Sequence, residues 1–145
     1  MFVVSAAEAL PAELDGLADL VTVHFPWGSL LRGATGAEPA ITGRLAALVK
    51  VGGTLRLLIS AAERDRASGL TSVEPDAVVA GWQRYGFAAT DCRPATGDDV
   101  SESRSTWAKR LGQRRDRSIW LFEFRRVSFG PHGDGRGHPP ARPAR

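Results

Sequence analysis

Apolar and polar positions along this chain alternate between strand-like runs and helical spacing, a pattern that predicts an α/β fold. Short runs rich in Val, Ile, Leu and aromatic residues predict strands over 2–4, 19–25, 54–60, 87–93 and 118–125. Apolar residues at a spacing of three and four predict helices over 39–50 and 73–85. Strands separated by helices are typical of sheets that contain parallel strands.

The connecting segments carry recognisable stop and start signals. Pro39 fits a first helical turn, Gly52-Gly53 is expected to end that helix, and Thr71 with Glu74 has the spacing of a capping box. We expect a loop or short turn over 6–11, loops over 29–36 and 94–99, and a surface loop or short helix over 61–70. A short helix is expected to start at Ser105 or Thr106 and to end near Leu111.

The stretch from Val21 to Leu31 is the most distinctive part of the pattern. It begins as an apolar strand and ends abruptly, because Pro26 cannot continue a strand ladder and Gly28 relaxes the backbone. A large aromatic residue, Trp27, is thereby left at the carboxyl end of a parallel strand. In open α/β sheets, this edge is where ligands bind.

Composition narrows the class of protein. The 145 residues, 43% of them hydrophobic, suit one globular domain, and no apolar run approaches the ~20 residues that span a membrane. Cys92 is the one cysteine, which excludes an internal disulfide and a multi-cysteine metal site. His132 and His138 stand isolated in the tail, so we expect no metal. The first apolar residues have no basic region before them, so we expect no signal peptide and a cytoplasmic protein.

Charge is unevenly placed along the chain. The formal net charge is +3, yet residues 104–117 hold six basic residues against Asp116. Such a basic block on a mildly acidic body suggests a face that docks on a polyanion. A solvated loop with ordinary surface charge is the alternative interpretation.

Two short motifs resemble one known family. The run His24-Phe25-Pro26-Trp27-Gly28-Ser29-Leu30-Leu31 resembles the F-P-W-G-[ST]-L signature of the aminoglycoside-resistance methyltransferases that modify N1 of an adenine in 16S rRNA. The run Ser105-Thr106-Trp107-Ala108-Lys109-Arg110-Leu111 resembles the family's second tryptophan motif. Both motifs occur in the family's order, and the resemblance extends from about Val3 to about Arg126.

The resemblance implies a Rossmann-like class I methyltransferase fold that uses S-adenosyl-L-methionine and acts on 16S rRNA within the 30S ribosomal subunit, at the decoding A site in helix 44, conferring aminoglycoside resistance. It assigns Trp27 and Trp107 to the two faces of the target adenine. The implied cofactor-binding residues are Ala7, Glu8, His24, Phe25, Pro26, Trp27, Gly28, Ser29, Ser105, Thr106 and Trp107. The implied RNA-binding residues are Lys109, Arg110, Arg115 and Arg117.

Physical chemistry agrees with those roles. A base inside folded RNA must be turned out of its stack to be methylated, and aromatic stacking that holds a base is worth ~1–3 kcal/mol. Adenine N1 carries its own lone pair and the sulfonium methyl group is already activated, so the reaction needs alignment more than a base. We therefore interpret His24 as a structural residue.

The Gly-rich cofactor loop and the first strands of the family's fold are missing before Val3 in this sequence. Residues 1–127 are therefore expected to form the C-terminal two-thirds of a methyltransferase domain, N-terminally truncated, and residues 128–145 a disordered tail. The complete form is expected to be a monomer. A catalytically inactive fragment that only binds rRNA is the alternative, and a methyltransferase for a small metabolite is a weaker one, because it needs no arginine cluster.

Overall fold

The computed structural model describes residues 5–60, 73–103 and 119–128. In these ranges a four-stranded mixed sheet has the order β1-β2-β4-β3. The strands are β1 (Ala18–His24), β2 (Val49–Ser60), β3 (Phe87–Pro94) and β4 (Ile119–Arg126). β1 and β2 are parallel, whereas β4 runs antiparallel to both β2 and β3.

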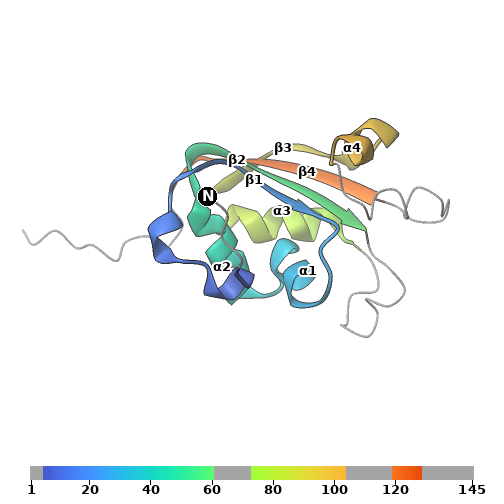
Figure 1. Cartoon of the computed structure of the whole chain (residues 1–145). Coiled ribbons are helices and arrows are strands. Elements are labelled where there is room, and N and C mark those ends of the chain that lie inside the picture. The colour runs from blue at the N-terminus through green and yellow to red at the C-terminus, as the bar shows by residue number, and fades with distance from the viewer. Residues whose placement is uncertain (1–4, 61–72, 104–118, 129–145) are drawn as a thin grey trace, which may run out of the picture.

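Helices cover the two faces of the sheet unequally (Figure 1). α1 (Gly28–Ala34), α2 (Pro39–Leu48) and α3 (Pro75–Gln83) lie on one face, and the six-residue α4 (Gly97–Glu102) lies on the other. Two short 3₁₀ turns, η1 (Ala7–Ala9) and η2 (Ala12–Leu14), precede β1. The face that carries the three helices holds the main hydrophobic core.

Strand direction brings several chain ends to one edge of the sheet. His24 pairs with Leu58, and Ser60 pairs with Ile119. Pro94, at the end of β3, pairs with Trp120. The carboxyl ends of β1, β2 and β3 therefore meet at the same edge, which is the edge where ligands bind in open α/β sheets.

Most of the predicted elements are confirmed. The strands expected over 19–25, 87–93 and 118–125 are β1, β3 and β4, and the helices expected over 39–50 and 73–85 are α2 and α3. The turn expected over 6–11 is also present, as η1. In β4, Trp120 packs partly buried against the core, and Ile119 is half-buried.

Two expectations around the first helices are wrong. The segment over 29–36 is not a loop but α1, because Leu31 and Ala34 are buried in the core on one side of a short helix. Gly52-Gly53 does not separate helix from strand, since β2 already begins at Val49. Gly52 adopts a φ of 81°, and the pairing with β1 shifts register nearby, so the glycines form an irregularity inside the strand.

Two expectations around the later helices are also wrong. Glu74 is not the third residue of a capping box but the N-cap of α3, whose first turn is fixed by Pro75. The segment over 94–99 is not simply a loop, because α4 begins at Gly97. Thr96 and Asp99 form a reciprocal capping box there, a T-x-x-D signal that was present in the sequence.

Several expectations concern segments that lie outside the described residues. They are the strand over 2–4, the segment 61–70, Thr71, the helix after Ser105 and the tail from residue 129.

Trp82 is the centre of the main core. Its side chain is fully buried, and its ring meets Phe87 edge-on at 5.3 Å and Phe124 at 5.9 Å between centroids. The indole Nε1–H donates to the carbonyl of Ala34 at 2.8 Å, which ties α3 to the end of α1. Trp82 is thus a core residue, and its polar atom is satisfied.

We expect Trp82→Ala to lower the free energy of unfolding by about 3–5 kcal/mol, because it leaves a large cavity and an unpaired carbonyl. Urea unfolding followed by circular dichroism measures the change. The matched control is Trp27→Ala, since Trp27 is 74% exposed and its loss is expected to change stability by no more than about 0.5 kcal/mol. Equal destabilisation by both variants would contradict this assignment of the core.

Candidate functional site

The turn that follows β1 is strained. Phe25 has a φ of +50°, a left-handed conformation that a bulky residue rarely adopts and that the following Pro26 disfavours further. Such a residue costs on the order of 1–3 kcal/mol and persists only where its surroundings fix it. Here the Phe25 amide donates to the carbonyl of Leu58 at 2.8 Å, and the ring of Pro26 is buried.

Trp27 leaves this turn in an extended conformation, with φ −141° and ψ 163°, and is the N-cap residue of α1. Gly28 follows with a φ of +59°, which a glycine adopts without strain. The indole is 74% exposed, at the carboxyl edge of the sheet. Ser29 is exposed beside it.

His24 ends β1 on the face of the sheet that carries α4. Burial lowers the pKa of its imidazole, and the positive charge of Arg56 lowers it further, whereas a backbone hydrogen bond with Ser103 raises it. Burial is the largest of the three effects. A ring whose pKa is lowered mainly by burial and that is tied to the end of α4 fits the structural role expected for His24.

The two residues expected before β1 lie in η1. Glu8 is exposed in η1, and the half-buried Ala7 packs against the core. The segment that follows is held to α2 by Arg44, which bonds the Leu10 carbonyl at 3.0 Å and the Asp15 carboxylate at 2.9 Å. Within the described ranges, no hydrogen bond or ion pair joins Glu8 to the turn that carries Trp27.

The second tryptophan motif and the basic block lie outside the described residues. This applies to Ser105, Thr106, Trp107, Lys109, Arg110, Arg115 and Arg117. The described residues on either side of the block are Ser103 and Ile119. Ser103 contacts His24, and Ile119 pairs with Ser60, so both flanks meet the same edge of the sheet as Trp27.

Ser60 is a candidate that the sequence analysis missed. It ends β2 at this edge, its side chain is buried, and its Oγ has no hydrogen-bond partner within the described part of the chain. An unpaired buried hydroxyl costs roughly 1–3 kcal/mol, and such groups often mark places where a ligand completes the bonding. One serine at a strand end gives no sequence signal that would have singled it out.

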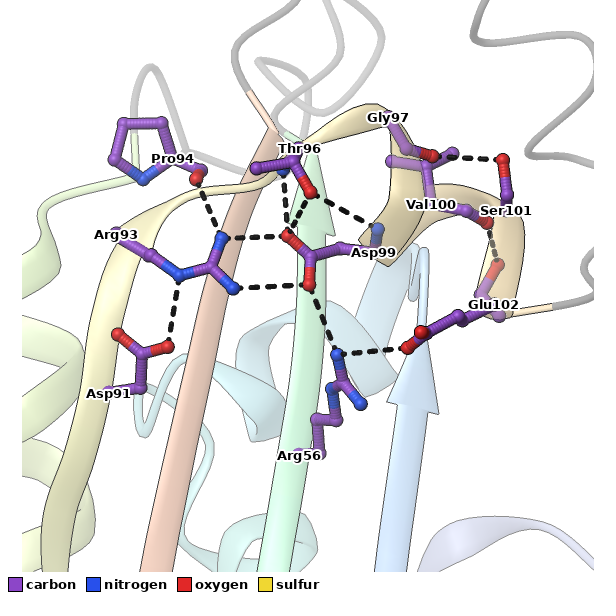
Figure 2. Close-up of polar contacts among 11 residues, drawn as sticks. Arg56, Asp91, Arg93, Pro94, Thr96, Gly97, Asp99, Val100, Ser101 and Glu102 are labelled. Carbon is purple, nitrogen blue, oxygen red and sulfur yellow. Dashed lines mark hydrogen bonds and ion pairs between the residues drawn. The ribbon is translucent and has the colours of Figure 1, made fainter.

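A polar network on the α4 face was also missed. The Asp99 carboxylate lies between the guanidinium groups of Arg56 and Arg93 (Figure 2). Arg93 makes a two-point contact with it, at 2.7 Å and 3.1 Å, and Arg56 adds a third contact at 3.2 Å. The network joins β2, β3 and α4, and its sequence signal was the capping box at Thr96.

Asp99 and Arg93 both strongly favour their ionised forms in this network. Hydrogen bonds from Arg93 hold the pKa of the Asp99 carboxyl well below its usual range, helped by the Thr96 backbone amide. The same contact raises the pKa of Arg93. Asp99 is only 7% exposed, so its charge is compensated by the arginines rather than by water.

Two kinds of site are not seen among the described residues. They contain no cluster of three or more His, Cys, Asp or Glu side chains that could hold a metal ion. None of the helices in the described ranges has the length and apolar character needed to cross a membrane.

Comparison with known proteins identifies the class. A family model described as 16S rRNA (adenine(1408)-N(1))-methyltransferase matches residues 1–125. The chain therefore belongs to the 16S rRNA (adenine(1408)-N(1))-methyltransferase family, as the two tryptophan motifs predicted. Its sheet and helices accordingly belong to the Rossmann-like α/β fold of the methyltransferases that use S-adenosylmethionine.

Individual relatives agree with this family. An enzyme of that name from Escherichia coli is 29% identical over 130 residues, covering 83% of this chain and 59% of the relative. The crystal structure of the 16S rRNA methyltransferase KamB matches with a TM-score of 0.72 at 27% identity, covering 88% of this chain and 61% of that one.

A second solved structure is a variant of the family enzyme from Catenulisporales acidiphilia with the cosubstrate SAM. It matches with a TM-score of 0.67 at 30% identity, covering 86% of this chain and 60% of that one. The chain thus spans about three-fifths of the length of the relatives that it matches.

We expect Asp99→Asn to lower the free energy of unfolding at pH 7 by about 1.5–3 kcal/mol, the range for hydrogen bonds to charged groups. Because the folded pKa of Asp99 is depressed, its contribution is present above the unfolded value of ~3.9 and is lost as pH falls. The difference in the free energy of unfolding between wild type and variant should shrink by at most about 1.4 kcal/mol per pH unit below ~3.9.

Urea unfolding at pH 7 and at pH 3 measures this change. Asp98→Asn is the matched control, because Asp98 is an exposed neighbour in the same helix turn with the same charge. A gap that stays the same size at both pH values would contradict the role given to the ionised carboxylate.

Proposed function

We propose that this chain transfers a methyl group from S-adenosyl-L-methionine to N1 of an adenine in the decoding A site of 16S rRNA, and that it thereby confers aminoglycoside resistance. The observation that carries the proposal is the exposed Trp27 on a strained turn at the ligand-binding edge of the sheet. A large exposed aromatic residue in so constrained a backbone has a geometry suited to stacking on a base.

The turn is suited to hold a flat ring in place. Phe25 and the buried Pro26 fix the backbone just before Trp27, so little conformational entropy is lost there when a base stacks on the indole. By the resemblance, Trp107 takes the other face of the target adenine. Two aromatic faces would also favour the positive charge that develops on the methylated ring.

The residues at this edge fit the cofactor. S-adenosylmethionine supplies an activated methyl group on a sulfonium centre, with an adenosine and an amino acid to be bound. We assign the cofactor to the strand end from His24 to Ser29, with Ala7 and Glu8 and with Ser105, Thr106 and Trp107. Ser60 adds a buried hydroxyl that lacks a partner among the described residues and that a polar group of a ligand can satisfy.

The reaction asks these residues for alignment rather than for proton transfer. Adenine N1 attacks the methyl carbon directly, so the site must hold the two reactants in line and exclude water. The half-buried His24 agrees with this requirement, because burial disfavours its charged, proton-donating form.

The RNA is held mainly through its phosphates in this proposal. Lys109, Arg110, Arg115 and Arg117 would neutralise phosphates beside the target base and fix the register of the protein on the RNA. The substrate is the 30S subunit, the protein acts in the cytoplasm, and the complete enzyme is a monomer. Residues 1–127 form the methyltransferase part in this proposal.

We expect Trp27→Ala to reduce methyl transfer to isolated 30S subunits by roughly 5- to 150-fold, which corresponds to the ~1–3 kcal/mol of one base–aromatic stack. Transfer is measured with radiolabelled S-adenosylmethionine, and primer extension locates the modified adenine. Trp27→Phe keeps a stacking ring and should retain most of the activity.

Val127→Ala is the control, because Val127 is an exposed apolar residue beyond the other end of β4. Equal activity of wild type and Trp27→Ala would contradict the role of Trp27. RNA binding by the wild type without methyl transfer would instead favour the inactive RNA-binding fragment.

A further inference from the structure

α4 is a short helix with one strong attachment to the sheet. It has six residues, and it packs on the face opposite the main core (Figure 1). The Asp99 carboxylate accepts from Arg93 at 2.7 and 3.1 Å, from Arg56 at 3.2 Å, and from the amide and hydroxyl of Thr96 at 2.8 Å each. The three contacts from Arg93 and Arg56 fix α4 across β2 and β3, and the two from Thr96 cap the start of the helix.

A second contact sets the direction of the helix. Arg56 also reaches Glu102, three residues after Asp99, at 3.7 Å (Figure 2). One guanidinium from the middle of the sheet therefore touches α4 at both the start and the end of its last turn. Glu102 is the final residue of the helix, and Ser103 follows as its C-cap.

The end of α4 leads directly to the Trp27 turn. Ser103 makes a backbone hydrogen bond with His24, which ends β1 and immediately precedes the strained Phe25. In the sheet register, Arg56 pairs with Thr22 and Leu58 pairs with His24, so Arg56 and His24 lie two positions apart on one face of neighbouring strands. Arg56, α4 and His24 thus form a continuous chain of contacts.

We propose that Arg56 and Asp99 are positioning residues for the Trp27 turn: they fix α4 across the sheet, so that Ser103 holds His24 and His24 holds the strand end from which the turn leaves. The role assigned to them in methyl transfer rests on the function proposed above. Neither residue contacts the turn directly.

Because Phe25 is strained, this chain of contacts keeps the Trp27 turn in its conformation in addition to stabilising the fold. A left-handed aromatic residue before proline reverts to a relaxed conformation unless contacts on both sides fix it. The hydrogen bond from the Phe25 amide to the Leu58 carbonyl fixes Phe25 from β2. The hydrogen bond between Ser103 and His24 fixes the residue that precedes Phe25. A displacement of about 1 Å at a reacting centre can reduce rate by roughly 100-fold.

The test follows the His24 ring by NMR pH titration in the 145-residue chain, where it is one of three histidines and is assigned by the signal lost in His24→Asn. In Asp99→Asn we expect the His24 pKa to rise, because α4 shifts and the ring becomes less buried. Loss of the Ser103 hydrogen bond acts in the opposite direction, but burial is the larger of the two effects on this pKa. Electrostatics alone predicts the opposite, since removing a negative charge lowers the pKa of a histidine.

Thr96→Ala decides the matter if Asp99→Asn fails to fold or gives an ambiguous shift. This exposed substitution removes the cap of α4 without changing any charge, so a rise in the His24 pKa supports the proposal. Asp98→Asn is the matched control and should leave the titration nearly unchanged. An unchanged or lowered His24 pKa in Thr96→Ala overturns the proposal.

Methylation of 30S subunits gives the second measurement. We expect kcat to fall roughly 10- to 100-fold in Asp99→Asn and to fall less in Thr96→Ala. If wild type transfers no methyl group, the proposed function fails, yet the titration of His24 still decides the positioning role. Wild-type kcat in a variant with a shifted His24 pKa would overturn its link to catalysis.

Discussion

The left-handed backbone at Phe25 is the constraint on which the candidate site depends. It turns the chain out of β1 sharply enough to leave Trp27 exposed at the sheet edge while Pro26 is buried. Its conformational cost must be offset by surrounding contacts, and those contacts come from the neighbouring strand β2 and from the face of the sheet that carries α4. The Leu58 carbonyl supplies one of them, and the α4 side supplies the other through His24.

The two faces of the sheet therefore have different tasks. The face covered by α1, α2 and α3 carries the apolar core around Trp82, which gives the domain most of its burial. The other face carries a short helix fixed by ion pairs around Asp99. Charged contacts are directional, so they fix a position more narrowly than apolar packing does, and that precision suits a surface beside a reacting centre.

Much of the fold could be predicted because its strands and longer helices have regular apolar periodicity. The four strands, α2 and α3 were all indicated this way. α1 and α4 were missed because each is too short for periodicity to stand out, and α4 is held by Asp99 rather than by an apolar stripe. Trp27 was found because its motif is distinctive, whereas Ser60, Arg56 and Asp99 depend on contacts between distant segments.

Binding of S-adenosylmethionine to this chain is the step that distinguishes an enzyme from a protein that only binds RNA. The chain spans about three-fifths of its relatives, and the turn, Ser60 and His24 all lie within the described part. Calorimetric titration of the purified 145-residue chain with S-adenosylmethionine tests the account most directly. The account predicts saturable binding in the micromolar range, and a folded chain that gives no binding would contradict it.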